Sequence, residues 1–338
     1  MSLPPPSRAL ADRLLAPGLF LLVGALFLAS LSVGPSAIDL ATAWREWRAG
    51  GDGTAAVIFA EIRLPRAVLG LLVGAALGLA GAALQGLLRN PLAEPGLIGI
   101  SPSAALGAVA AFYSGISTAV PLALPLGGMA GAFVAVALLY ALAGRDAGVM
   151  TLILAGIAVG SVAGALTSLA LSLSPNPFAL TEIVFWMLGS LADRSLDHVW
   201  LAGPFILAGA ALLLSVGRGL DALTLGEETA RSMGFSLGRL AACVILGSAL
   251  AVGAAVAVTG AIGFVGLIVP HLLRPLVGHQ PGRLLPLSAL GGAALLLAAD
   301  VAVRLGAPGP ELKLGVVTAL LGAPFFLALV LQTRRRLA

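Results

Sequence analysis

The sequence predicts an all-α membrane protein with about ten transmembrane helices. Of its 338 residues, 59% are hydrophobic and only 10% are charged, whereas a soluble domain carries about 25% charged residues. The mean hydropathy is +1.06, and apolar stretches of about 20 residues, long enough to cross a bilayer as helices, recur along the chain. The 44 glycines suit close packing of helices in lipid. A soluble protein is excluded, because so few charges cannot cover a water-facing surface.

Ten apolar segments are interpreted as membrane spans, and several of them are interrupted by glycine or proline. They cover residues 18–33, 64–88, 97–113, 122–143, 150–173, 198–217, 239–258, 262–277, 285–303 and 315–332. This organisation divides the chain into a cytoplasmic N-terminal segment (1–17), a transmembrane domain (18–333) and a basic cytoplasmic tail (334–338).

The distribution of basic residues indicates the orientation. An even number of spans puts both termini on one side of the membrane, and cytoplasmic segments carry an excess of lysine and arginine. With cytoplasmic termini, the inner segments hold twelve of the nineteen basic residues, including Arg334, Arg335 and Arg336. Both termini are therefore expected in the cytoplasm. The pI of 10.2 reflects this arrangement rather than affinity for nucleic acid.

Two connections between spans are polar enough to lie outside the bilayer. On the outer side, residues 174–197 contain Phe185 and Trp186, which suit a short interfacial helix. On the inner side, residues 218–239 form the longest cytoplasmic connection between spans. There Thr224 can cap a short helix that Gly234 ends.

Residues for common catalytic chemistry are missing, so the chain is not expected to be an enzyme. Lys313 is the only lysine and lies outside any phosphate-binding glycine loop, so ATP hydrolysis would need another polypeptide. The three histidines lie far apart and Cys243 is the single cysteine, which leaves no metal motif and no disulfide. Asp300 precedes Arg304 by four residues, a spacing that predicts an ion pair on one helix rather than a proton relay.

Two polar motifs flank one of the membrane helices. Arg63-Leu-Pro-Arg66 stands at its start, and the segment from Gly86 to Ser101, which contains Pro91 and Pro95, follows its end. Buried charge and unpaired backbone are both costly in lipid. These motifs therefore indicate a functional element rather than a passive anchor.

With these motifs the chain resembles the permease subunits of bacterial importers for iron chelates, haem and cobalamin, the FecCD/BtuC-like family. Further segments that are similar to the family occur in the same order. They are Leu152–Ala158, Phe185–Ser190, Gly226–Gly234, Gly260–Arg274 and Gly315–Phe325. The resemblance extends from Arg63 to Leu331, almost the whole membrane region.

The resemblance implies a type II ABC importer permease in the bacterial inner membrane, surrounded by lipid. Ten helices would form a subunit that pairs with a second copy around a central path. Two ATP-binding subunits, which would hold ATP and Mg, are expected on the cytoplasmic side, and a periplasmic substrate-binding protein on the other. No cofactor, metal or nucleic acid is expected on this chain.

The resemblance also implies residues that dock the binding protein. Arg63, Arg66 and Arg304 match positions where family members carry arginines that meet glutamates on the two lobes of the binding protein. Guanidinium–carboxylate pairs are bidentate and directional, so they would fix its register over the pore. The alternative is that these long side chains only reach toward the membrane surface.

A cytoplasmic gate is implied by two further matches. Asn90-Pro91-Leu92 corresponds to the family's constriction, and Val149 and Met150 correspond to a second constricting pair. Family members have small hydroxyl residues at that second place, a departure that leaves the role of Val149 and Met150 open. Flanking prolines stiffen the loop, and apolar rings can close a pore by dewetting. A tight turn between helices explains the same residues equally well.

The polar connection on the inner side matches the coupling helix that seats in a groove on the ATPase. The residues that the match implies for this contact are Leu225, Gly226, Glu227, Ala230, Arg231 and Gly234. Small residues among them would allow close packing, and the charged ones would lie at the rim. An ordinary solvated helix is the alternative.

The expected function is a homodimeric, ATP-driven import channel for an iron chelate, either a siderophore complex or haem. Cobalamin is the alternative substrate within the same family. No ring of histidine or tyrosine is present to ligate haem iron, so selectivity would rest with the binding protein. From another class, a secondary transporter driven by an ion gradient would need intramembrane carboxylates, which this chain mostly lacks.

Overall fold

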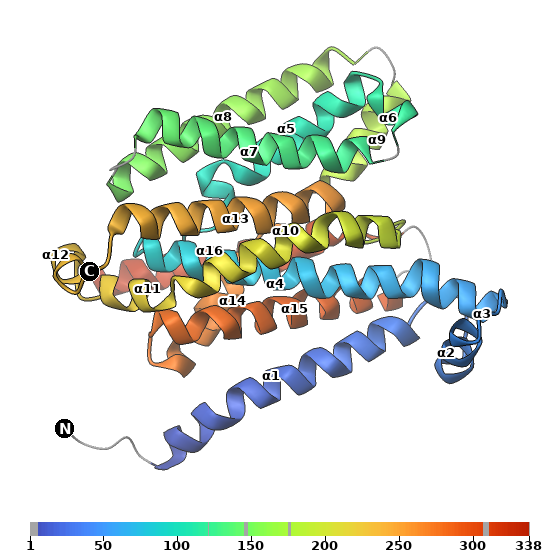
Figure 1. Ribbon diagram of the computed structural model, residues 1–338, viewed down its shortest axis with the longest axis horizontal. Helices are drawn as coiled ribbons and strands as arrows, with labels where there is room; N and C mark the ends of the chain where they lie inside the picture. Colours follow the sequence, from blue (N-terminus) through green and yellow to red (C-terminus); the bar gives the residue numbers. More distant parts are fainter. Residues whose placement is uncertain (1–5, 121, 145–147, 175–176, 307–310, 338) are drawn as a thin grey trace.

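The computed structural model describes residues 6–120, 122–144, 148–174, 177–306 and 311–337, and within these ranges every regular element is helical. Ten of the helices form the bundle that Figure 1 shows. Their bounds are Pro6–Ser32 (α1), Leu64–Leu87 (α4), Ile100–Tyr113 (α5), Ala123–Ala143 (α7), Val149–Ser172 (α8), Leu196–Ser215 (α10), Leu237–Thr259 (α13), Val265–Leu273 (α14), Pro281–Gly306 (α15) and Leu314–Leu337 (α16). Each of the ten predicted spans coincides with one of them.

Among the described residues, seven helices are long and apolar enough to cross a membrane, and α5, α14 and α16 supply shorter apolar segments. Two helices extend beyond the predicted spans. α1 starts at Pro6, within the segment expected to precede the membrane, and α16 runs to Leu337, through the predicted basic tail. Hydropathy locates the apolar part of a helix, whereas backbone hydrogen bonding continues into the polar residues beyond it.

Shorter helices lie at both ends of the bundle. The α12 end carries Gly217–Leu223 (α11) and Glu227–Ser232 (α12), together with the start of α1 and the end of α16 (Figure 1). The opposite α9 end carries Leu40–Arg48 (α2), Thr54–Val57 (α3), Ile116–Ala119 (α6) and Pro177–Met187 (α9). The last of these is the helix expected within residues 174–197, whereas hydropathy did not predict α2 and α3.

Three irregular turns complete the chain. A π-helical turn, Ile58–Arg63 (η1), joins α3 to α4, and two 3₁₀ turns, Pro95–Ile98 (η2) and Arg274–Val277 (η3), precede α5 and follow α14. The π turn continues α4 toward the α9 end, and η2 places the start of α5 against α8.

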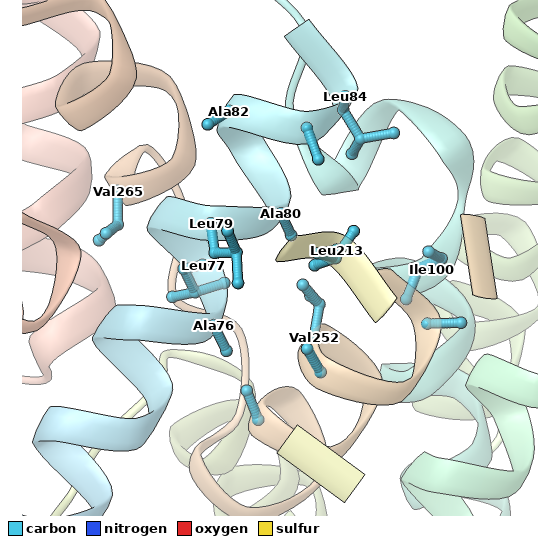
Figure 2. Close-up of a cluster of buried hydrophobic side chains, with 14 of the residues drawn as sticks. Ala76, Leu77, Leu79, Ala80, Ala82, Leu84, Ile100, Leu213, Val252 and Val265 are labelled. Atoms are coloured by element: carbon cyan, nitrogen blue, oxygen red, sulfur yellow. The ribbon is translucent and has the colours of Figure 1, made fainter. Parts of the chain in front are cut away.

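Helix α4 occupies the centre of the bundle and is apolar on all sides, as a fully enclosed helix requires. Figure 2 shows its side chains from Ala76 to Leu84 surrounded by those of four other helices. The neighbours that the view labels are Ile100 of α5, Leu213 of α10, Val252 of α13 and Val265 of α14. Residues at both ends of α4 are therefore held in place by the core.

Glycines on α4 allow backbones to touch. A Cβ atom at Gly81 would lie 2.0 Å from the carbonyl oxygen of Gly266 on α14, and one at Gly78 would lie 2.1 Å from that of Ser288 on α15. Small residues at such crossings let helices approach closely in lipid.

Replacing Gly81 with alanine is expected to destabilise the permease by about 1–3 kcal/mol, since the added methyl group must push two backbones apart. Gly24→Ala on α1 is the matched control, because nothing lies within 4 Å of a Cβ atom there and alanine favours a helix. Thermal unfolding of the purified variants in detergent measures the difference. Equal midpoints for the two variants would contradict the crossing as described.

Candidate functional site

Arg63, the last residue of η1, lies inside the protein with 3% of its surface exposed. Its guanidinium donates hydrogen bonds to the carbonyl oxygens of Leu31 at 2.9 Å and Ser32 at 2.7 Å, and to that of Ser36. The last carbonyl groups of a helix have no partner within it, and here Arg63 supplies one for α1. All of these donors point into the chain itself, and contact of Arg63 with a docking protein stays a prediction.

Arg66 and Arg304 share one buried carboxylate at the same end. The Arg66 Nε atom lies 2.9 Å from Asp300 Oδ1, and Arg304 Nη2 lies 2.8 Å from Asp300 Oδ2. Glu311 also binds the Arg66 guanidinium. The predicted ion pair between Asp300 and Arg304 is confirmed, and the group of two cations and two anions is neutral as a whole.

Arg304 also holds the end of α1. Its guanidinium donates to the carbonyl oxygens of Ser30 and Val33, both at 2.8 Å, and to the Ser30 hydroxyl at 2.7 Å. Cations are favourable at a helix C-terminus because the carbonyl groups there carry partial negative charge. Arg63 and Arg304 thus approach α1 from two different helices and fix its position.

The structure brings the three predicted docking arginines together at the α9 end but gives each of them internal partners. The side chains of Arg66 and Arg304 are 11% and 5% exposed, whereas that of Glu311 is 34% exposed. A cavity of about 480 Å³ lies beside them and is lined in part by Arg66, Arg304 and Glu311. Docking through Arg63, Arg66 and Arg304 remains a prediction.

The loop after α4, at the α12 end, contains Asn90 and Leu92. The Asn90 side-chain oxygen accepts a hydrogen bond from the Leu92 N–H at 2.9 Å, and Arg89 has a left-handed φ of 47°. Glu94 accepts a hydrogen bond from the N–H of Phe264, at the start of α14. Burial raises the pKa of Glu94, whereas this hydrogen bond lowers it. The loop is a tight turn fastened to α14, and a gate role remains a prediction.

A buried polar contact fastens the end of α4 to the same region. Gln85 is 2% exposed, and its amide nitrogen donates to the carbonyl oxygen of Gly266 at 3.2 Å. Its amide oxygen accepts a hydrogen bond from the Arg274 guanidinium of η3. The end of α4 is thereby bound to α14 and η3, and the loop that follows α4 is bound to the start of α14.

The second predicted gate position lies at the start of α8. Met150 is 68% exposed in the single chain. Val149 is the first residue of α8, and its side chain lies outside the part that the structure describes. A Cβ atom at Gly156 of the same helix would lie 2.6 Å from the Cα atom of Ile98, so α8 packs directly on η2.

Helix α12 is the predicted coupling helix, and the structure corrects its N-terminal cap. Thr224 ends α11 and donates its hydroxyl to the Asp221 carbonyl; Gly226, with a φ of 108°, is the N-cap of α12 instead. Ala230 is completely buried within this chain, and its contact with an ATPase remains a prediction. Gly234 has a φ of 88° and follows the end of the helix, as predicted.

The surface of α12 combines exposed apolar and charged side chains. Leu225, which precedes the helix in the sequence, is 64% exposed, and Met233, which follows it, is 55% exposed. Arg231 within the helix is also exposed. Glu227 lies in the first turn, where a carboxylate is favourable next to the helix N-terminus. This surface suits contact with another protein.

An ion pair that the sequence did not predict links α12 to the loop after α4. Arg89 Nη2 lies 3.7 Å from Glu227 Oε1, and the two side chains are 52% and 41% exposed. Arg89 immediately precedes the predicted gate residue Asn90. Sequence reasoning missed this pair because the two residues lie far apart along the chain, with no spacing rule to connect them.

This chain is similar to a known protein family and to named relatives over most of its length. The model of the FecCD transport family matches residues 21–332. The cobalamin import system permease protein BtuC of Halobacterium salinarum is 39% identical over 83% of this chain and 75% of its own length. The Fe(3+) dicitrate transport system permease protein FecD of Escherichia coli is 36% identical over 91% of this chain and 95% of its own.

A solved structure described as an inward-facing conformation of a metal-chelate type ABC transporter has the same fold. The two structures superpose with a TM-score of 0.83 at 34% sequence identity. The match covers 95% of this chain and 99% of the chain in the solved structure. Family, relatives and fold agree over nearly the full length. The chain belongs to the FecCD transport family and is a membrane-spanning permease of an ABC importer.

Proposed function

We propose that this permease forms the channel of an importer that carries an iron chelate, a siderophore complex or haem, across the bacterial inner membrane. The relative named for Fe(3+) dicitrate and the metal-chelate type neighbour support an iron chelate. Cobalamin is the second candidate, because vitamin B12 import permeases of Salmonella are 41% identical over 87% of this chain. The chain would contribute no catalytic group, and the ATPase subunits would bind ATP and Mg.

The observation that carries the proposal is the exposed helix α12 joined to the loop after α4. In this assembly two copies of the chain pair, two ATPase subunits contact α12 and Leu225 at the cytoplasmic end, and a binding protein approaches the α9 end. The excess of arginine in the inner segments supports this orientation. ATP can favour one state of the channel only through contacts that differ between the states, and α12 offers such a contact.

Movement of α12 would reach the gate through the Arg89–Glu227 pair. When an ATPase subunit shifts α12, Glu227 attracts or releases Arg89, and the turn containing Asn90 and Leu92 follows. Glu94 and Gln85 hold the two sides of this turn to α14, so the displacement would pass to the helices that surround the path.

At the α9 end, docking would require exchange of partners. Glu311 is the most exposed member of the network, and a carboxylate from the binding protein could replace it on Arg66. Bidentate pairing favours arginine for such an exchange. The cavity beside Arg66 and Arg304 leaves room for an acidic side chain to enter.

The function is tested by uptake into proteoliposomes that contain this permease, its ATPase and its binding protein, with ATP trapped inside. Ferric siderophore, haem and cobalamin are offered in turn. ATP-dependent uptake of one ligand would identify both the mechanism and the substrate. Uptake driven by an imposed proton gradient in the absence of ATP would instead support a secondary transporter.

Reversal of one charge in the Arg89–Glu227 pair is expected to lower ATP-dependent uptake several-fold, with little effect on stability, because exposed ion pairs contribute only about 0–1 kcal/mol. Arg89→Glu and Glu227→Arg test each side of the pair separately. The double variant, which restores opposite charges, should recover uptake. Equal uptake by the single and the double variants would show that the pair carries no coupling.

A further inference from the structure

The α9 end contains a cavity of about 600 Å³ within a single chain. Its walls come from α5, α7, α9, α10 and α13 and from the connections before α10 and α16. Its volume falls in the range of small-molecule sites, which are about 300–1,000 Å³. This cavity lies at the end of the bundle opposite α12 and is separate from the coupling residues.

One side of the cavity is aromatic. Phe112 of α5 and Trp186 and Phe185 of α9 line it, together with aliphatic residues of α13. Flat rings of this kind bind the apolar body of a ligand over a large area.

The other side is cationic and carries an unsatisfied donor. Arg194 lines the cavity, and its Nε atom is buried without a hydrogen-bond partner. Within the described part of the chain, no carboxylate forms an ion pair with Arg194. Burial lowers the pKa of Arg194, and the charge of Asp193 opposes the shift, but a guanidinium remains protonated at neutral pH. Arg194 is only partly buried, but its buried Nε–H without a partner is costly, so the arrangement favours an anion.

Lys313 and His198 also line the cavity, next to Arg194 on its cationic side. The ammonium of Lys313 lies 5.6 Å from the centroid of the Phe185 ring at the rim of the cavity. The Nδ1 atom of His198 accepts a hydrogen bond from the Ser195 N–H at 3.3 Å. In the neutral ring this assigns the proton to Nε2, which is then a donor. Glu182 and Asp193 also line the cavity, but both are exposed to solvent.

We propose that this cavity binds a small organic carboxylate, with the carboxylate on Arg194 and its apolar body against Trp186 and Phe112. Lys313 contributes a second positive charge, which suits a ligand with two carboxylates. All the residues that line the site belong to one chain.

The test uses the complete permease, without ATPase or binding protein, in nanodiscs. Isothermal titration calorimetry compares phthalate, an aromatic dicarboxylate, with phthalamide, its neutral diamide. Phthalate is expected to bind at least ~10-fold more tightly, because hydrogen bonds to charged groups are the stronger ones. Equal affinity for the two compounds, or no heat from phthalate at millimolar concentration, would overturn the proposal.

Variants assign the binding to this cavity. Arg194→Gln is expected to weaken phthalate binding at least ~10-fold, and Lys313→Gln is expected to weaken it less. Arg48→Gln is the matched control, because Arg48 is an exposed arginine on α2 at the same end. If Arg194→Gln alters folding, Lys313→Gln retains the test, since Lys313 lies at the rim. Unchanged affinity for phthalate in both variants would refute the site. Failure of uptake in the proteoliposome experiment would count against the proposed transport function and would not affect the proposal of this site.

Discussion

Substitution of Leu225 by aspartate is expected to abolish ATP-dependent uptake while leaving the purified permease folded. Leu225 is 64% exposed beside α12, so the free chain tolerates a polar group there. In the importer the same position would be covered by the ATPase, and an unpaired carboxylate in a desolvated contact costs several kcal/mol. A loss of only 1.4 kcal/mol already weakens association ten-fold.

Association with the ATPase and uptake are measured on the same preparations. Leu312→Asp is the matched control for association with the ATPase alone, because Leu312 is an exposed leucine near the α9 end, where no ATPase contact is proposed. Ala230→Leu provides the contrast: Ala230 is buried inside the chain, so this variant should lower the stability of the permease itself. Full uptake by Leu225→Asp would remove α12 from the coupling mechanism.

Removal of the charge of Asp300 is expected to destabilise the permease by about 3–5 kcal/mol, the cost of breaking one side of a buried ion pair. Asp300 lies between Arg66 and Arg304, and in Asp300→Asn only Glu311 remains to balance two guanidinium groups. The α9 end would lose the ion pair that joins α4 to α15. A fall of several degrees in the unfolding midpoint in detergent measures this effect.

The double variant Asp300→Asn with Arg66→Gln separates charge imbalance from lost contacts with α1. It removes one charge of each sign and keeps the hydrogen bonds of Arg304 to the end of α1, so it should be more stable than Asp300→Asn alone. Asp52→Asn is the control, because Asp52 is exposed at the α9 end. If Asp300→Asn unfolds at the same temperature as the native protein, the network is not a stabilising element.

The positions of the membrane helices were predictable because lipid imposes a simple rule on sequence. A spanning segment must be apolar and helical, so each of the ten apolar segments could be recognised without knowledge of its neighbours. The short helix α2 was not predictable in this way. It contains Trp44, Arg45 and Trp47, a mixture whose helical fold depends on the cap at Asp39 and on packing of both rings against Phe59.

The candidate sites were predictable as motifs but not as contacts. Arg63, Arg66 and Arg304 could be identified from the family resemblance, yet the partners of their guanidinium groups come from α1, α15 and the residues before α16. In the same way, the burial of Ala230 cannot be predicted from its residue type, and the ion pair between Arg89 and Glu227 cannot be predicted from their positions in the sequence. Such contacts depend on how helices distant in sequence cross, which no local spacing encodes.

By itself, the sequence determined that this protein is a helical membrane protein, since composition and hydropathy depend only on residue type, and the resemblance of its motifs to a known family indicated a permease. Only the tertiary structure decided that Arg63 and Arg304 hold the end of α1, that Arg66 and Arg304 share Asp300, and that the Arg194 Nε atom lies buried without a partner. The physical reason is that a charge in a low-dielectric interior is stabilised by whichever groups the packed helices bring within hydrogen-bond distance. Those groups are selected by the crossing of the helices, which approach closely at glycines where α4 meets α14 and α15.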